Sequence, residues 1–516
     1  MRKNILSLSI AAMIGGLGFV GSASAMTTWV NTGVTASNLV VSQTNRGHIL
    51  TVPYFTTQNS NMTLLNIVNS DTTNGKAVKV RFRSALNSDD IFDFQLYLSA
   101  GDVWTGQVTA GANAGSALLT RDNSCTLPSS VNQPFVLDRL PPVTATFTAA
   151  QRLNLTREGY IEIFNIADIP PSTATGSLSR AITHVSGVPA CAGLQAAALD
   201  LGNDKSYAQA LAIGMTNPTG SLFANYSIVN IATNQAFSGE ATAIVAASDT
   251  IGTPAAGALV WWPQTSAAAT SPINNFTADP LLNTVGFAAA MFDLPDLSTP
   301  YMNIVGTPAA LPITQAFLLT QALATKAVAN EYLTDPSVVA ATDWVFSMTT
   351  RRYNVAANYT AAATARRVYT DYSTVTYNSN PLSNFFDSTN TSVAADGLSI
   401  CAAINPNAAY YDRSETTTGT QFVISPGVSA SLTLCGETSV LSFNAGLASN
   451  SVLSSTVARS DVTLAYTDGW ASFYTPGLGN KGLPITGKAF VKAVNASAAA
   501  GSTTTFGGSY EHKYTR

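Results

Sequence analysis

The sequence predicts a mainly β protein, made of β-sandwich-type domains with helical insertions and two disulfides. Three observations carry this prediction: apolar and polar residues alternate in several short runs, the four cysteines are an even number in a chain that begins with an export signal, and 46% of the residues are hydrophobic. Alternation with a period of two places apolar side chains on one face of a strand. The apolar content can fill large cores, which excludes a disordered chain.

Residues 1–25 have the three parts of a secretory signal peptide: a basic start, an apolar run from Ile5 to Val20 and a small-residue ending. The apolar run is shorter than the roughly 20 residues that span a bilayer, which disfavours a membrane anchor. We therefore expect cleavage between Ala25 and Met26 and no transmembrane segment in the mature chain. The expected location is the cell surface or the medium outside the cell.

The mature chain divides into three segments by its pattern of strand-like and Ala-rich runs. Residues 26–254 predict an N-terminal β-rich domain, and residues 255–345 predict a middle segment that contains helix. Residues 346–516 predict a C-terminal β-rich region, whose strands could also pair with the N-terminal sheets. We find no repeat of fixed period, which disfavours a solenoid or a propeller.

The clearest local prediction is an antiparallel hairpin. Every second residue of Lys76–Arg83 is apolar, and cations stand between the apolar positions. The pattern returns in Phe92–Leu98 after a polar turn, so the two runs should pair with their apolar sides inward. In this pairing Asp93 would meet Arg81 or Arg83 across the strands.

Other runs predict further strands and two helices. The strands are Gly159–Ile166, a pair formed by Leu222–Ile231 and Ala241–Ala246, and a hairpin that turns at Asp468-Gly469 before Trp470–Tyr474. Two stretches rich in Ala and Leu predict helices, because they contain few β-branched residues. They are Leu194–Ile213 and Thr314–Leu333, the second ending before Asp335-Pro336.

The cysteines are Cys125, Cys191, Cys401 and Cys435. An even number in an exported chain predicts two disulfides. Proximity in the sequence favours Cys125–Cys191 and Cys401–Cys435, although three pairings are open. The alternative, one zinc ion held by four thiolates, is disfavoured because no Cys-x-x-Cys pair occurs.

Charge is scarce in this chain. Charged residues make up 10% of the sequence, against about 25% in an average soluble domain, and the formal net charge is -4. Such a chain lacks the cations that nucleic acid requires of its partners. A surface rich in hydroxyl and amide groups costs less to desolvate than an ionic surface, which favours packing against other copies or against glycans.

Sequence signatures of catalysis are missing. The three histidines, His48, His184 and His512, stand far apart, and no zinc-protease, serine-hydrolase or phosphate-loop motif occurs. Glu158 and Glu162 could form the carboxylate pair of a glycosidase. Their position in a half-buried strand instead predicts that both face solvent. We therefore expect no enzymatic activity and no required cofactor.

Two weaker ligand signals remain. The acidic turn Asp89-Asp90, followed by Asp93, could bind calcium, although it lacks the spacing of known calcium loops and an ordinary solvated turn is favoured. Exposed aromatic residues could stack on a surface polysaccharide, although a place in a core or an interface is the commoner role. The aromatic candidates are Trp261-Trp262, Tyr410-Tyr411 and Trp470.

Several short blocks, spread over most of the chain, carry a resemblance to known proteins. They are Pro53–Phe55, Leu64–Asn69, Lys76–Arg83, Phe92–Ser99, Gly101–Trp104, Arg157–Glu162, Asn330–Leu333 and Thr342–Val345. These blocks resemble a family of exported proteins of Gram-negative proteobacteria, described as cell-surface or surface-layer-like proteins. The resemblance implies export and a surface location, and it supplies no catalytic residues.

The function expected from these observations is that of a structural cell-surface protein that self-associates, as the subunit of a surface layer (S-layer). Its partners would be further copies, in a homo-oligomer or a two-dimensional lattice, with surface polysaccharide as an additional candidate. The alternative is a monomeric surface adhesin or carbohydrate-binding protein, which would need the same export signal and the same fold.

Overall fold

The predicted fold class is confirmed by the computed structural model, which consists mainly of strands with short helices and two disulfides. The predicted signal peptide, the cleavage site between Ala25 and Met26, and Trp261-Trp262 lie outside the residues that the structure describes. Those residues are 32–141, 147–192, 194, 207–260, 281, 295–302, 312–358, 361, 366–377, 380–416, 432–444, 450–457, 459–462, 466–495 and 504–516.

The N-terminal region contains two antiparallel sheets. In spatial order, the first comprises β1 (Asn38–Val41), β13 (Thr242–Ala247), β2 (Ile49–Thr56), β10 (Glu158–Ile169), β4 (Gly75–Ser84), β5 (Asp90–Leu98) and β8 (Cys125–Leu127). The second comprises β12 (Gln235–Glu240), β11 (Leu222–Asn230), β3 (Met62–Asn69), β6 (Val103–Ala110), β7 (Ser116–Leu119) and β9 (Gln133–Pro134).

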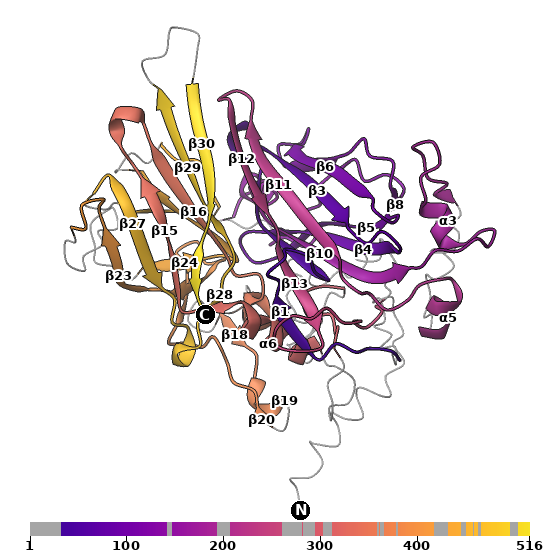
Figure 1. The fold of residues 1–516 in the computed structure, drawn as a ribbon. Helices are drawn as coiled ribbons and strands as arrows, with labels where there is room; N and C mark the ends of the chain where they lie inside the picture. Colours follow the sequence, from indigo (N-terminus) through magenta and orange to yellow (C-terminus); the bar gives the residue numbers. More distant parts are fainter. Residues whose placement is uncertain are drawn as a thin grey trace, which may run out of the picture.

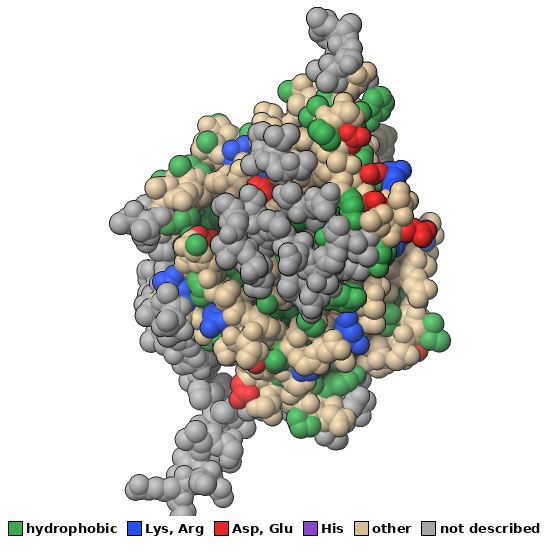
Figure 2. Space-filling model, turned by 90° about the vertical axis from the view of Figure 1, so that its left-hand side faces the viewer, with side chains coloured by type: hydrophobic (Ala, Val, Ile, Leu, Met, Phe, Trp, Pro, Cys, Tyr) green, Lys and Arg blue, Asp and Glu red, His purple; other side chains and the backbone are tan. Residues whose placement is uncertain are grey.

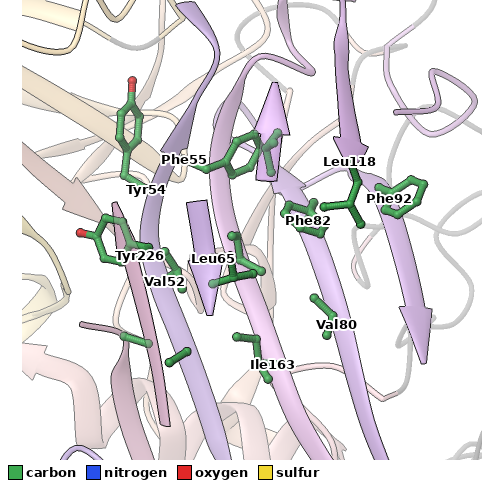
Figure 3. Close-up of a cluster of buried hydrophobic side chains, with 14 of the residues drawn as sticks. Val52, Tyr54, Phe55, Leu65, Val80, Phe82, Phe92, Leu118, Ile163 and Tyr226 are labelled. Carbon is green, nitrogen blue, oxygen red and sulfur yellow. The ribbon is translucent and has the colours of Figure 1, made fainter. Parts of the chain in front are cut away.

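These two sheets pack face to face around one hydrophobic cluster, as the alternation of the strands predicts. Val80 and Phe82 of the seven-stranded sheet lie in the same cluster as Leu65 and Leu118 of the six-stranded sheet (Figure 3). The predicted hairpin is confirmed as β4–β5, with Arg81 directly opposite Asp93.

The C-terminal region contains two more sheets, and two of their strands, β15 and β16, begin within the predicted middle segment. The four-stranded sheet comprises β23 (Asn405–Tyr411), β27 (Asp468–Tyr474), β15 (Ala327–Leu333) and β31 (Lys513–Thr515). The five-stranded sheet comprises β26 (Arg459–Val462), β25 (Thr438–Phe443), β16 (Ala341–Ser347), β29 (Lys488–Asn495) and β30 (Thr504–Glu511). None of the described C-terminal strands joins the sheets of the N-terminal region.

Small elements connect these sheets. The minor sheets are β14 (Ala324–Thr325) with β28 (Leu483–Pro484), β17 (Val355–Ala357) with β18 (Arg367–Tyr369), β19 (Thr376–Tyr377) with β20 (Asn380–Pro381), and β21 (Thr391–Val393) with β22 (Ile400–Ala403) and β24 (Thr433–Cys435). The α-helices described are α2 (Ala149–Asn154), α3 (Leu178–Ile182), α5 (Tyr207–Ala212) and α6 (Pro312–Leu323). The 3-10 turns are η1 (Gln58–Ser60), η3 (Pro336–Val338), η4 (Arg351–Tyr353), η6 (Tyr372–Thr374) and η7 (Leu478–Asn480).

The five-stranded sheet is central, because it packs on both faces. In β16, Trp344 and Phe346 belong to the core shared with the four-stranded sheet, whereas Ala341 and Val345 belong to the N-terminal hydrophobic cluster. At the junction, β30 lies beside β12 (Figure 1). The two regions therefore share one continuous packing arrangement.

The second predicted helix is wrong in its C-terminal half. Helix α6 ends at Leu323, and Ala327–Leu333 forms β15, which pairs with β27 and β31. Helix propensity is a weak preference that tertiary contacts can override, and here alternating side chains such as Val328 and Tyr332 enter the core. Of the first predicted helix, the described part is α5, and residues 195–206 lie outside the description.

Two predicted strand pairings are also wrong, although strands do form there. β11 pairs with β3 and β12, whereas β13 pairs with β1 and β2 in the other sheet. β27 pairs with β15 and β23, so it does not return along β26. In both cases the alternation predicts the strand but does not determine which strand it pairs with. A strand that is distant in the sequence can pair with it and leave the same apolar face buried.

The disulfides are Cys125–Cys191 and Cys401–Cys435, the pairing favoured by sequence proximity. The second bond links directly opposed residues of β22 and β24. Closing loops of 66 and 34 residues stabilises each region by roughly 4 kcal/mol in the chain-entropy model. Within the described residues, no helix has the length and apolar character needed to cross a membrane.

Candidate functional site

The charged side chains of β4 and β10 lie inside the molecule, which corrects the prediction that Glu158 and Glu162 face solvent. Glu162 is fully buried and accepts a hydrogen bond from Arg83 Nε at 3.3 Å. Glu158 accepts hydrogen bonds from the Tyr54 hydroxyl at 2.9 Å and the Ser455 hydroxyl at 2.6 Å. The prediction failed because the C-terminal region covers this face of the sheet.

The C-terminal segments that cover this face carry charged side chains of their own, and these pair with one another. Arg352 pairs with Asp296, and Arg351 Nη2 lies 3.2 Å from Glu437 Oε1, all four side chains being fully buried. Burial is the main cause that raises the pKa of Glu437, and the nearby Arg351 opposes it. We call this set the charged layer; it consists of Lys79, Arg81, Arg83, Asp90, Asp93, Glu162, Asp296, Arg351, Arg352 and Glu437.

The three candidate calcium ligands do not converge on one point. Asp90 pairs with Arg81, and Asp93 pairs with Lys79 and lies 3.8 Å from Arg81 Nη1. Asp89 is buried in the turn, where its carbonyl accepts a hydrogen bond from Ser84 N. Among the described residues, no group of three or more His, Cys, Asp or Glu side chains could hold a metal ion. Calcium binding stays a prediction without a described site.

The histidines remain apart. His48 and His512 are buried, and burial lowers the pKa of His48 to about 4 and that of His512 to about 3. His48 Nδ1 accepts a hydrogen bond from Ala246 N, so this ring has a structural role. His184 Nδ1 lies 3.6 Å from Asp102 Oδ2 at the surface.

The predicted aromatic candidates separate into buried and exposed residues. Tyr410 is buried, whereas Trp470 is 42% exposed and stacks on Tyr411 with 4.9 Å between ring centroids. Tyr474, four positions further along the same face of β27, is 43% exposed. The four-stranded sheet therefore presents aromatic side chains to solvent.

The sequence reasoning missed the surface that we call the open face: the side chains of β11, β3 and β6 that point away from the core. The cross-strand register aligns them in rows, such as Phe223–Val68–Val103 and Asn225–Asn66–Thr105. Every member is exposed or half-buried, and none is charged. The open face consists of Phe223, Asn225, Ser227, Val229, Met62, Leu64, Asn66, Val68, Val103, Thr105, Gln107 and Thr109.

No known protein family, characterised protein or solved structure matches this chain. The resemblance to surface-layer-like proteins therefore remains an expectation, and the argument for function depends on the surfaces of the molecule itself.

A groove of about 820 Å³ lies between the two regions. One wall is formed by the edge strand β12, its neighbour β11, and β1 and β13 at the edge of the seven-stranded sheet, and the other by β29, β30 and β31. Its side chains are mostly hydroxyls and amides, with two acids and two cations: Glu240, Glu511, Lys488 and Arg516. The sequence could not predict this groove, because the residues of its walls lie some 270 positions apart, as the bond from Ser509 to Ser238 illustrates.

Proposed function

We propose that this chain is a structural cell-surface protein that self-associates, as the subunit of a surface layer. The observation that carries the proposal is the open face. The exposed face of a sheet in a monomeric protein ordinarily carries charged residues, and the three strands of this face carry none. On that side of the sheet a charge stands at the edge, on Glu240 of β12. Its natural partner is the open face of a second copy.

Contact between two such faces avoids the largest cost of burial. Removing an ion from water costs several kcal/mol unless a partner is supplied, whereas amides and hydroxyls can exchange water for one another. The apolar members, among them Phe223 and Val103, would gain roughly 25 cal/mol for each Å² removed from water. A pair of open faces therefore needs no ionic complementarity to associate.

Other parts of the surface are similar in character. Figure 2 shows the face on the side of the C-terminal strands, where Lys, Arg, Asp and Glu side chains are few and separated by uncharged groups. A substantial minority of the charged residues is internal. The buried ones are Lys76, Lys79, Arg81, Arg83, Asp89, Asp90, Glu158, Glu162, Asp168, Asp296, Asp343, Arg351, Arg352, Glu437 and Lys488.

Export is supported by two independent features. The sequence begins with the parts of a signal peptide, and the two disulfides are of the kind that persists in oxidising compartments outside the cytoplasm. Surface location is further supported by the family resemblance.

The first experiment is electron microscopy of washed cells and of purified protein lacking residues 1–25, with calcium and with a chelator. Ordered two-dimensional arrays in the wild type and their loss in a deletion strain are expected. Loss of arrays on chelation would add calcium as a ligand between copies. A monomer under every condition, together with an unchanged envelope on deletion, would contradict the proposal and favour the adhesin.

A matched pair of variants tests the open face itself. Asn66→Lys with Thr105→Lys places two cations in its central row, and assembly should be lost because facing copies would repel each other and bury charge. The control, Thr376→Lys with Asn380→Lys, adds the same charges to the exposed hairpin β19–β20. Equal assembly by both variants would show that the open face is not the contact.

A further inference from the structure

We propose that the groove between β12 and the strands β30 and β31 binds a neutral saccharide chain. The groove and the open face share Asn225 and Ser227 of β11, but the centre of the open face lies on β3 and β6, outside the groove. Saccharide binding can therefore be tested separately from self-association. It adds a ligand to the molecule, and it offers a means of attaching the molecule to surface polysaccharide.

Charge balance within the groove favours a neutral ligand. Glu240 accepts a hydrogen bond from the side-chain amide of Asn45, and Glu511 pairs with Lys488. The fourth charge, Arg516, lies over the ring of Tyr514 at 5.0 Å. The two acids and the two cations of the groove balance in number, so the groove has no excess of one charge to attract an ionic ligand.

The remaining polar groups suit a ligand that both donates and accepts hydrogen bonds. Ser227 Oγ and Ser238 Oγ are 2.9 Å apart on adjacent strands, and Ser509 donates to the Ser238 carbonyl from the opposite wall. Hydroxyls can play either role. Sugar hydroxyls, like water, can both donate and accept hydrogen bonds. A saccharide can therefore replace water in the groove without leaving these groups without hydrogen-bond partners.

A buried tyrosine provides an independent sign of an absent polar partner. Tyr226 lines the groove and is 1% exposed, yet its hydroxyl has no hydrogen-bond partner among the described residues. Its hydroxyl points away from Val52 and Leu65 (Figure 3). A buried hydroxyl without a partner costs roughly 1–3 kcal/mol. A ligand hydroxyl, or a water that the ligand retains, would remove that cost.

The ring of Tyr226 holds its place because the opposing residue is a glycine. Tyr226 lies opposite Gly239 in the register of β11 and β12, and a Cβ atom at Gly239 would stand 2.6 Å from the tyrosine ring. Any larger residue would push the ring from the groove. The hydroxyl, amide and carboxylate groups that line the groove are suited to the O–H groups of a pyranose.

The test begins with an array of defined oligosaccharides of three to six units, neutral and acidic, probed with the chain lacking residues 1–25. We expect at least one neutral oligosaccharide to bind, and calorimetry then gives its affinity. Binding of acidic oligosaccharides alone, or of none, would overturn the proposal.

Three variants then localise the binding. Ser238→Trp should fill the groove and abolish binding, and Glu240→Gln should weaken it about tenfold, the loss of one charge-assisted hydrogen bond. Thr376→Trp, the same bulk on exposed β19, should bind as the wild type does. Binding by Ser238→Trp at wild-type affinity would overturn the proposal. The assembly-deficient variant Asn66→Lys/Thr105→Lys should retain saccharide binding, which separates this proposal from self-association.

Discussion

The outer faces of the two N-terminal sheets are opposites. The seven-stranded sheet carries Lys79, Arg81, Arg83 and Glu162 on its outer face, and all four are buried. The open face of the six-stranded sheet has no charged member, and a charge on that side stands at the sheet edge, on Glu240 of β12 opposite Asn225. Part of the charge of this molecule is buried where the two regions meet, so fewer charged side chains are left for the surface. Composition alone therefore overstates how charged the surface is.

The largest expected effect comes from breaking one pair in the charged layer. Glu162→Ala leaves Arg83 buried without its carboxylate, and such a loss typically costs roughly 3–5 kcal/mol. Urea denaturation followed by fluorescence should show the midpoint fall accordingly. The double variant Arg83→Met/Glu162→Leu, which removes both charges, should recover much of the loss. A double variant as unstable as Glu162→Ala would show that the pair is needed for more than neutrality.

A second comparison makes the same change on both faces. Thr51 lies on the covered face, directly opposite Glu162, and Thr105 lies on the open face. Thr51→Asp should destabilise by roughly 2–4 kcal/mol, because it buries a second negative charge beside the first. Thr105→Asp should change the free energy of unfolding by less than about 0.5 kcal/mol. An equal fall in the free energy of unfolding for both variants would contradict the claim that one face is covered and the other is open.

The strands of these faces show what the sequence can and cannot predict. The β4–β5 hairpin, its register and the inward Val80 and Phe82 follow from alternation within one short segment. The same alternation predicted an exposed Glu162. The sequence pattern of the polar side of a strand is the same whether that side faces water or faces charged residues of another segment. Arg352, whose charge interacts with Glu162 in the folded protein, is distant from it in the sequence.

Sites made of distant segments were out of reach for the same reason. The open face depends on β11 lying beside β3, a pairing that local patterns left undetermined. The groove depends in addition on β12 meeting β30. The disulfides could be predicted because each joins the nearest cysteines in the sequence.

The buried histidines predict a third, smaller effect, on the pH dependence of stability. In the folded protein, burial and, to a smaller extent, the charge of nearby Lys76 lower the pKa of His48 from an ordinary value of 6.5 to about 4. Between these values the unfolded chain binds more protons, so stability is present at pH 7 and is lost as the pH falls from about 6.5 to about 4. The loss is about 3 kcal/mol at most.

Denaturation curves between pH 7 and pH 4 would measure this dependence. His48→Gln should flatten it by the equivalent of one proton, and His512→Gln should do the same, since burial lowers the pKa of His512 to about 3. A wild-type slope that both variants retain would show that carboxylates, and not these histidines, govern the acid response.

The smallest expected effect on stability belongs to the assembly-deficient variant. Asn66→Lys/Thr105→Lys changes only the open face, so its unfolding midpoint should match that of the wild type while its assembly is lost. Sedimentation measures the assembly and urea denaturation measures the stability. A large fall in the midpoint would mean that the fold itself depends on the open face.

Ion pairs that water does not reach, such as Arg83–Glu162 and Arg352–Asp296, are beyond the reach of dissolved salt as well. Mobile ions screen exposed charges over about 10 Å at 0.1 M, but they do not enter a packed interior. The folded state and contacts through neutral surfaces should therefore respond little to ionic strength. A protein built in this way would keep its form and its associations in dilute and in saline surroundings alike.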